Sequence, residues 1–343
     1  MLSLKKRLIA ASVTLAAALS FTGSVSAEEV NVYSARKEAL IKPLLDKFSA
    51  ETGIEVNLVT GDADALISRM NSEGKFSPAD VLITTDVGRL VRAKQQGLTR
   101  IVVSDTLEQA IPAQLRDDEN QWFSLTMRAR PIMYSPERVD PEQLSTMEAL
   151  TDAEWKGRIC IRSSSNIYNQ SMVAAMIQQT GEEDTLKWAN GLVKNFARPP
   201  KGGDRDQIKA VVSGQCDIAI ANTYYLAGML NSADDSEKNI ASQVKVFWPN
   251  QDDRGAHINV SGAALAKHAP NSDNAVKLLE YMVREDAQAW YAKTNHEYPV
   301  RDGVEWSETL KQFGTFKAEE IPLHRVGELN AEAVKVMDKA GWK

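Results

Sequence analysis

The sequence predicts an α/β protein made of two lobes, each built from two separate parts of the chain. Three observations support this prediction. Short apolar runs alternate with amphipathic helical runs along most of the chain, which is typical of sheets covered by helices on both faces. Two long extended stretches, residues 122–134 and 257–265, each connect one series of these elements to the next, and we interpret them as crossovers between lobes. The length of 343 residues also exceeds that of one average domain.

The N-terminal segment predicts a secretory signal peptide over residues 1–27. Residues 5–7 are Lys-Lys-Arg, an apolar run follows from residue 8 to about residue 21, and residues 25–27 (Val-Ser-Ala) resemble a cleavage site. An N-terminal membrane anchor is the alternative interpretation, but the run is short and wrongly flanked for one. No cysteine follows the run that could carry a lipid. We therefore exclude this segment from the fold prediction and expect an exported protein.

The charge balance excludes several classes of partner. The formal net charge is −6, and it becomes more negative without the first 27 residues, which carry three basic residues and no acidic one. An acidic protein without a basic cluster is a poor match for nucleic acid or an anionic membrane surface. No later run of about 18 apolar residues predicts a membrane span.

Residues 29–97 form three predicted strand–helix pairs, which indicates a mainly parallel sheet covered on both faces. The first helix carries apolar residues at helical spacing and ends at Gly53, a residue type that often ends helices. Asp86 is predicted to cap the third helix. The predicted strands span residues 29–33, 54–60 and 79–84, and the predicted helices run from about residue 40 to 53, 62 to 73 and 86 to 97.

A second series of elements follows the extended stretch at residues 122–134, which is predicted as one long strand containing Arg128 and Arg130. We assign residues 28–126 and 259–301 to an N-terminal lobe, and residues 127–258 and 302–343 to a C-terminal lobe. The predicted strands of the second series are residues 158–161, 216–221 and 244–248; the predicted helices are residues 171–178, 183–195, 206–213 and 226–230, followed by a long helical run at 274–292 and helices joined by loops after residue 307.

Two loops of the second series carry the functional signal. Residues 161–170 and 221–227 each follow a predicted strand and open a predicted helix, which places Tyr168, Tyr224 and Tyr225 just beyond the carboxyl ends of strands. Ligands of open α/β sheets bind at such ends. Three phenol oxygens form a donor set for a hard, highly charged cation, with Fe³⁺ and tyrosinate as the natural pair. The alternative is that these tyrosines pack against the protein with their hydroxyls in water.

Arg36 and Arg128 lie at predicted lobe edges and are candidates to hold an anion that completes the coordination of the metal; the alternative is a surface ion pair for each.

Cys160 and Cys216 lie in the strands that lead into the two tyrosine loops. Export permits a disulfide between them, and two free buried thiols are the alternative. The four histidines are too scattered for a histidine metal site, and we expect surface or capping roles for His257, His268, His296 and His324.

Four segments resemble the bacterial periplasmic ferric-iron-binding proteins, the substrate-binding components of ABC iron transporters. The segments are VNVYSAR (30–36), SPADVLITTD (77–86), WKGRICIRSSSNIYNQS (155–171) and CDIAIANTYYLAGM (216–229). The resemblance covers nearly all of the chain after residue 27, and the NIYNQ and NTYY motifs are specific to this family among solute-binding proteins.

The resemblance implies a type II periplasmic-binding-protein fold, in which two α/β lobes joined by a two-strand hinge hold iron in the cleft. It implies that Tyr168, Tyr224 and Tyr225 are ligands to Fe³⁺. It also implies that Arg36 and Arg128 hold a synergistic anion such as carbonate. A monomer in the periplasm that delivers iron to an ABC-type permease in the inner membrane is expected.

The chain departs from the family pattern at one place. Several members carry a histidine ligand, or a His-Tyr pair, directly after the segment that reads YSAR here, but Lys37 and Glu38 occupy those positions. Glu38 and Tyr33 are candidates for an additional ligand. The expected site is therefore the three tyrosines, completed by an exogenous anion or water.

Two other classes of function are weighed against iron binding. The same fold could bind an organic solute such as thiamine, a polyamine or a phosphonate, with the aromatic residues stacking on the ligand. An enzyme, for instance an exported hydrolase, would need a nucleophile and base or a catalytic motif, and no P-loop, nucleophile elbow or HExxH motif is present. We expect a binding protein and no enzyme.

Overall fold

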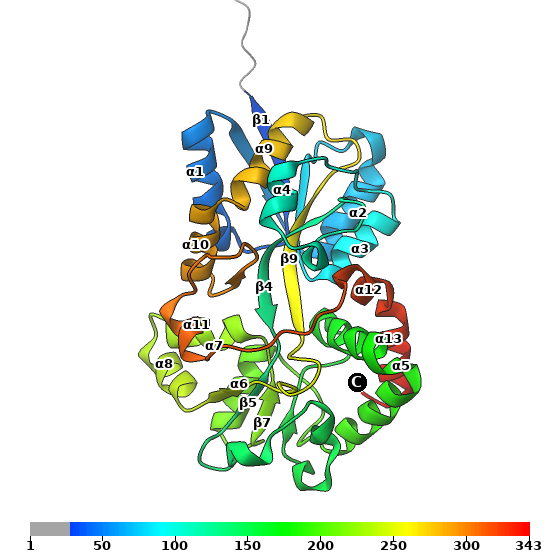
Figure 1. Ribbon diagram of the computed structural model, residues 1–343, viewed down its shortest axis with the longest axis vertical. Coiled ribbons are helices and arrows are strands. Elements are labelled where there is room, and N and C mark those ends of the chain that lie inside the picture. Colours follow the sequence, from blue (N-terminus) through cyan, green and yellow to red (C-terminus); the bar gives the residue numbers. More distant parts are fainter. Residues whose placement is uncertain (1–27) are drawn as a thin grey trace, which may run out of the picture.

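The computed structural model describes residues 28–343, and the predicted signal peptide, residues 1–27, lies outside the described residues. Two lobes lie one above the other along the long axis of the molecule, and each is organised around its own sheet (Figure 1). Within the described part of the chain, every helix is too short or too polar to cross a bilayer.

The sheet of the first lobe has six strands in the order β10-β4-β9-β3-β1-β2. β1 pairs in parallel with β2 and β3, but β9 is antiparallel to both β3 and β4, and β10 is antiparallel to β4. The parallel arrangement predicted for the strands of residues 29–97 is confirmed, but the sheet as a whole is mixed, because β9 returns from the second lobe and enters it in the opposite direction. The strands are β1 (Glu29–Ser34), β2 (Glu55–Thr60), β3 (Val81–Thr85), β4 (Phe123–Ala129), β9 (Ile258–Leu265) and β10 (Tyr298–Pro299).

Helices cover both faces of this sheet, because successive side chains of a strand point to opposite faces. Val32 of β1 packs in the same cluster as Leu44 of α1, whereas its neighbour Tyr33 packs in the same cluster as Leu66 of α2. The predicted helix at residues 274–292 is two helices, α9 and α10, which meet near Val283. The helices of this lobe are α1 (Lys42–Thr52), α2 (Ala63–Glu73), α3 (Val87–Gln95), α4 (Asp105–Ala110), α9 (Ser272–Met282) and α10 (Glu285–Thr294).

The sheet of the second lobe has four strands in the order β6-β7-β5-β8, and only β6 and β7 are parallel neighbours. Its strands are β5 (Ile132–Tyr134), β6 (Ile159–Cys160), β7 (Ile218–Ile220) and β8 (Lys245–Phe247). Its helices are α5 (Ile167–Lys194), α6 (Asp204–Val212), α7 (Thr223–Leu230), α8 (Asp235–Ser242), α11 (Glu308–Gln312), α12 (Leu323–Glu328) and α13 (Asn330–Lys339). Short 3-10 helices are η1 (Glu38–Leu40), η2 (Gly74–Phe76), η3 (Ala113–Leu115), η4 (Pro141–Gln143), η5 (Glu148–Thr151) and η6 (Ala153–Trp155).

The predicted helices at residues 171–178 and 183–195 belong to one long element, α5, which has a non-helical residue at Gly181 (φ 81°). The break expected between them is thus a kink at a glycine, the residue that adopts a positive φ without strain. Helix α8 was not predicted, and its short polar sequence lacks a clear apolar stripe.

The hinge begins where the predicted strand at residues 122–134 divides into β4 of the first sheet and β5 of the second. The division falls at Arg130 and Pro131, because a proline has no N–H to donate to a continuing ladder. A second crossover leads from the loop at residues 249–257 into β9. These two segments form the two-strand hinge.

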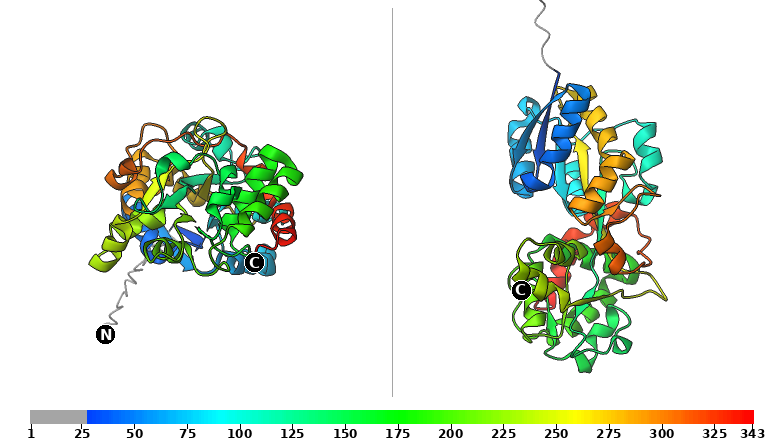
Figure 2. Two further views of the ribbon diagram at one scale, coloured as in Figure 1. Left: turned by 90° about the horizontal axis from the view of Figure 1, so that it is seen from below. Right: turned by 90° about the vertical axis from the view of Figure 1, so that its left-hand side faces the viewer.

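A third segment, which we call the C-terminal strap (residues 313–322), lies against the second crossover. The Ala256 amide donates to the Lys317 carbonyl at 2.9 Å, and the Glu319 amide donates to the Ala256 carbonyl at 3.0 Å. Gly255 (φ 88°) allows this approach, since a Cβ there would lie 2.6 Å from the Ala318 carbonyl carbon. The side view in Figure 2 shows the late, orange and red parts of the chain at the junction of the lobes.

Cys160 at the end of β6 and Cys216 just before β7 form a disulfide in the structure. The bond joins the two neighbouring parallel strands whose carboxyl ends carry the tyrosine loops. The spacing between these loops is therefore fixed covalently as well as by the sheet.

Candidate metal centre

A cavity of about 520 Å³ opens between the two lobes and contains all three predicted tyrosines. Its walls come from both lobes, so a change in the angle of the hinge changes its size. The first lobe contributes Ala35, Arg36, Lys37, Leu40, Thr85, Thr294, Asn295, His296 and Glu297, and the second contributes Tyr168, Arg205, Tyr224, Tyr225, Gly228 and Asn231.

The tyrosines reach the cavity because each lies in the first turn of a helix that follows a strand. Tyr168 is the second residue of α5, and the Asn166 side chain caps this helix by accepting a hydrogen bond from the Tyr168 amide at 3.2 Å. Tyr224 and Tyr225 are the second and third residues of α7, whose N-cap is Asn222. Both predicted strand-to-helix junctions are thus present at one edge of the sheet.

The phenol groups lie close together. The Tyr224 hydroxyl donates a hydrogen bond to the Tyr168 hydroxyl at 3.2 Å, and the rings of Tyr224 and Tyr225 lie with their centroids 4.3 Å apart. Two oxygen ligands of one hard cation lie within about 5 Å of each other, so Tyr168 and Tyr224 already meet this condition.

Burial and neighbouring groups raise the pKa values of Tyr224 and Tyr225, so these two phenols stay protonated when no cation is bound. Burial raises the pKa of Tyr225 to about 12, and the charges of Tyr168 and Asp204 act in the same direction. Burial also raises the pKa of Tyr224 well above its ordinary value, as do Tyr168 and Tyr225, while Arg128 opposes this rise. Several phenolates can therefore coexist here only with a strong positive charge between them.

A buried ionic network binds both tyrosine loops, residues 161–170 and 221–227, on their inner side. The Arg130 guanidinium donates to Asp204 Oδ2 at 2.9 Å, to Asn222 Oδ1 at 2.9 Å and to Asn169 Oδ1 at 2.7 Å. Asn169 follows Tyr168 in α5, and Asn222 caps the helix of the tyrosine pair, so one arginine fixes both. The sequence offered no signal for this network beyond an arginine in an apolar stretch, because its partners lie 39 to 92 residues away.

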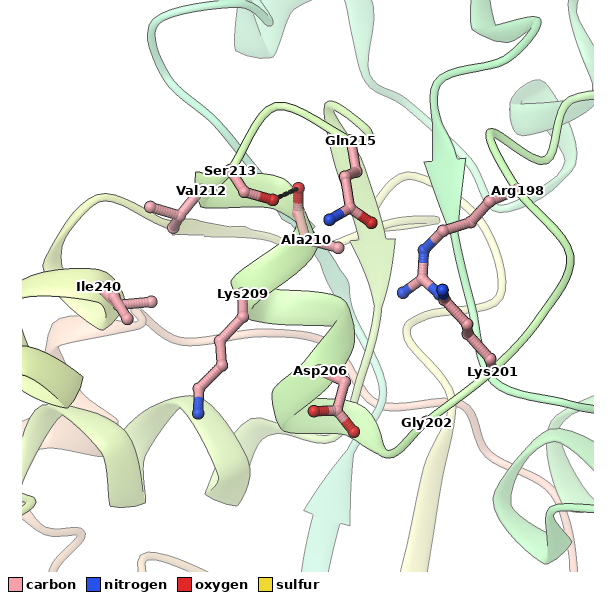
Figure 3. A pocket seen from close by; sticks show the side chains of 10 residues that line it. All are labelled: Arg198, Lys201, Gly202, Asp206, Lys209, Ala210, Val212, Ser213, Gln215 and Ile240. Carbon is pink, nitrogen blue, oxygen red and sulfur yellow. Dashed lines mark hydrogen bonds between the residues drawn. The ribbon is translucent and has the colours of Figure 1, made fainter.

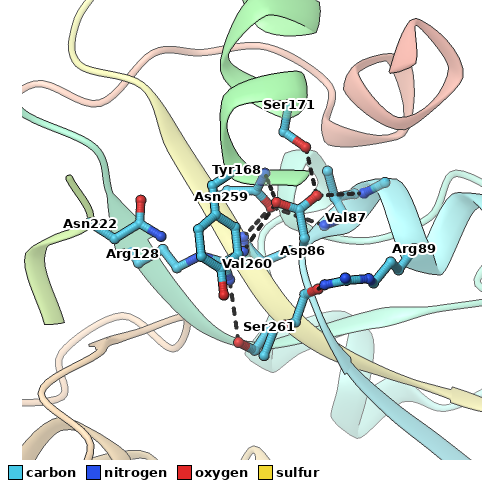
Figure 4. A network of polar contacts seen from close by, with 12 residues as sticks. Asp86, Val87, Arg89, Arg128, Tyr168, Ser171, Asn222, Asn259, Val260 and Ser261 are labelled. Atoms are coloured by element: carbon cyan, nitrogen blue, oxygen red, sulfur yellow. Dashed lines mark hydrogen bonds and ion pairs between the residues drawn. The ribbon is translucent and has the colours of Figure 1, made fainter. Parts of the chain in front are cut away.

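Asp86 connects the first lobe to the helix of Tyr168 (Figure 4). Its carboxylate accepts hydrogen bonds from the Ser171 hydroxyl at 2.6 Å and from Asn259 at 3.0 Å, and it pairs with Arg128 at 3.4 Å. The Arg128 guanidinium lies 5.2 Å from the centroid of the Tyr168 ring. Arg128 is thus buried and held beside a tyrosine of the cleft. The alternative that it forms an ion pair at the surface is wrong.

Arg36 lines the cleft from the first lobe and is also buried. Its Nη2 lies 2.5 Å from Glu297 Oε2, so a buried carboxylate already pairs with it. The sequence did not indicate Glu297, which lies 261 residues later in the chain.

The structure does not bring the two additional candidates, Tyr33 and Glu38, to the tyrosines. The Tyr33 hydroxyl donates to the carboxylate of Glu73 at 3.0 Å, on the face of β1 that packs against α2. Glu38 lies exposed in η1. Neither belongs to the described residues that line the cleft.

The expectation that the histidines serve surface or capping roles is wrong for His257. His257 is buried at the hinge, where its Nδ1 lies 2.5 Å from Glu319 Oε1 of the C-terminal strap. His296 lines the cleft. His268 is exposed and His324 is partly exposed, as expected.

Another cavity, of about 590 Å³, lies beside α6 in the second lobe and contains none of the predicted site residues (Figure 3). Its basic side chains do not converge, since Lys209 points away from Arg198 and Lys201. The cavity is lined by Arg198, Lys201, Gly202, Asp206, Lys209, Ala210, Val212, Ser213, Gln215 and Ile240.

Two α/β lobes on a shared hinge, with a cleft lined from both sides, define a type II periplasmic binding protein. The chain belongs to the family of bacterial extracellular solute-binding proteins, whose model matches residues 44–318.

Its relatives include proteins named for iron. The iron uptake protein A1 of Synechocystis sp. is 51% identical over 316 residues, which cover 92% of this chain and 88% of that protein. A Trichodesmium protein (IdiA, FutA), solved in complex with iron and citrate ligands, is 48% identical with a TM-score of 0.90 over 92% of this chain and 100% of its own. A ferric binding protein from Campylobacter jejuni is 40% identical with a TM-score of 0.87, over 92% of this chain and 100% of its own.

Proposed function

We propose that this protein binds ferric iron in the cleft and delivers it to an ABC-type permease in the inner membrane. The observation that carries the proposal is the meeting of Tyr168, Tyr224 and Tyr225 at one cavity, with two of their oxygens 3.2 Å apart. Relatives of this chain are named as iron uptake and ferric iron-binding proteins, and the structure of one of them contains iron and citrate.

In this mechanism Fe³⁺ replaces the hydroxyl protons of the three tyrosines. Three phenolates neutralise the charge of the ion, so this set of groups carries no net charge either before binding, when the phenols are protonated, or after it. Arg130 binds the side chains of Asn222 and Asn169, one in each tyrosine loop, and we therefore expect little rearrangement of the second lobe on binding.

An exogenous anion such as carbonate or citrate completes the coordination. Arg36 is our candidate to hold it, because it lines the cleft that contains the three tyrosines, whereas Arg128 is not among the residues that line this cleft. Arg128 was predicted for the same role, but Asp86 and Ser261 already bind it, and it contacts the ring of Tyr168. We propose that Arg128 assists the anion only through the position of Tyr168.

Delivery follows from closure of the two lobes around the ion and reopening at the permease. Closure requires that iron makes better contacts in the closed state than in the open one. We propose that the protein acts as a monomer in the periplasm, after export and removal of residues 1–27.

Colour and metal content test this function. We expect the chain from residue 28 onward to turn coloured on addition of ferric citrate, through a tyrosinate-to-iron charge-transfer band, and to retain about one iron per chain after desalting. The titration is repeated with and without bicarbonate to identify the anion, and with thiamine, spermidine and 2-aminoethylphosphonate as organic ligands. A colourless protein that binds one of these solutes would overturn the proposal.

The affinity for iron is expected to fall as the pH decreases. The pKa of Tyr225 is about 12 and that of Tyr224 is also raised, so both phenols are protonated between pH 5 and 8 and must release protons on binding. Each released proton weakens binding by about tenfold per unit of acidification, so at least about 100-fold per unit is expected from this pair. Competition with a chelator of known pH dependence measures the slope, and a slope near zero would contradict phenolate ligation.

A further inference from the structure

The first lobe faces the tyrosines with few side chains that can bind a cation. Its wall of the cleft contains two positive side chains, Arg36 and Lys37, and the carboxylate of Glu297, which pairs with Arg36. The Asn295 amide is buried and donates to the Leu40 carbonyl. Beyond two threonine hydroxyls and the side-chain oxygen of Asn295, which is buried without a hydrogen-bond partner among the described residues, the wall offers one imidazole.

That imidazole belongs to His296, the residue that follows the C-cap of α10. Nδ1 of this ring is shielded from solvent and has no hydrogen-bond partner among the described residues. Because the residue lines the cleft, we infer that Nε2 is the nitrogen that faces the cavity. A metal-binding imidazole needs such a nitrogen with a free lone pair. Burial also lowers the pKa of His296, which keeps the ring neutral at neutral pH.

The backbone of His296 adopts a left-handed conformation (φ 54°). Glycine is the usual residue at this position after a helix, and a larger side chain there costs about 1 kcal/mol. Histidine is among the residues that adopt this conformation more readily than most, so the backbone places the ring at the cleft without excluding a role for it.

We propose that Nε2 of His296 binds the ferric ion when the lobes close, and so supplies the ligand from the first lobe. This inference rests on the function proposed above. Imidazole is a suitable ligand for iron, and a neutral donor leaves the balance between Fe³⁺ and three phenolates unchanged. It also explains how the first lobe can bind the metal although Lys37 and Glu38 follow the YSAR segment. The contact exists only in the closed state, which gives iron the preference for closure that the mechanism requires.

Pulsed electron paramagnetic resonance on the iron-loaded protein tests this contact. We expect coupling of the ferric ion to a nitrogen nucleus that changes from the ¹⁴N to the ¹⁵N pattern when histidine alone is labelled with ¹⁵N. The coupling should vanish in His296→Gly and persist in His268→Ala, which removes an exposed histidine. The glycine variant suits the left-handed backbone, so it should fold at least as well as the wild type.

The same variant should weaken iron binding by at least about tenfold and speed iron release, while its charge-transfer band remains. A coloured wild-type protein without histidine coupling, or with coupling that survives in His296→Gly, would overturn the inference and leave the tyrosine site intact. A wild-type protein without the charge-transfer band would overturn both proposals, so the two failures are distinguishable.

Discussion

Replacing Tyr224 by phenylalanine is expected to remove the colour of the iron-loaded protein and to weaken iron binding by more than about 100-fold. Tyr224 is the central phenol, since its hydroxyl lies 3.2 Å from that of Tyr168 and its ring lies against Tyr225. Loss of a group that merely orients a ligand costs about 10- to 100-fold in metal affinity, and loss of the ligand itself costs more. Competition titration and visible absorption measure the two effects.

The matched control is Tyr134→Phe, which removes a hydroxyl from β5 in the same lobe but away from the cleft. Tyr224→Phe removes one hydrogen bond from the iron-free protein, so the stability of that form should change by about 1 kcal/mol or less. Ferric iron should raise the melting temperature of the wild type and of the control, but not that of Tyr224→Phe. A variant that remains coloured with unchanged affinity would refute the assignment of Tyr224 as a ligand.

Arg130→Met is expected to lower the free energy of unfolding of the iron-free protein by about 3–5 kcal/mol. The guanidinium of Arg130 is buried and donates to Asp204, Asn222 and Asn169. Its removal leaves the buried carboxylate of Asp204 with a single, longer ion pair, to Arg162 at 3.5 Å. Urea unfolding measures the loss, and iron affinity should fall as well, since both tyrosine loops lose their common support.

A surface variant and a double variant separate this effect from a general loss of charge. Arg325→Met breaks an exposed pair with Glu328 and should cost less than about 1 kcal/mol. Arg130→Met combined with Asp204→Leu should recover part of the loss, because the fully buried carboxylate is then removed and only the partly exposed Arg162 loses its ion-pair partner. An Arg130→Met protein as stable as Arg325→Met would show that the network contributes little.

The parts of the fold that were predicted correctly depend on local sequence. Gly53 marks the end of α1 and Asp62 marks the start of α2. In the structure Gly53 is the C-cap of α1 and Asp62 is the N-cap of α2. The strand-to-helix junctions of Tyr168 and Tyr224 were predicted for the same reason: a short apolar run, a capping residue and a helical run follow one another within a few residues.

The parts that were missed depend on contacts between distant residues. The pairings of Arg36 with Glu297 and of His257 with Glu319 join positions that lie 261 and 62 residues apart in the chain, and no periodic pattern specifies them. The direction of β9 is likewise set by the lobe from which the chain arrives, which its apolar sequence does not encode. His296 shows no pattern at all in the sequence, since a single histidine after a helix is common at surfaces.

The position of β9 also sets the order in which the molecule can be assembled. β9 lies between β3 and β4, so the central ladder of the first sheet is missing until residue 265 has been synthesised. By that stage the ribosome has already produced every strand of the other half of the molecule. The sheet of the half that begins the polypeptide is consequently the later of the two sheets to be completed, and a nascent chain shorter than this has an open sheet edge available to chaperones.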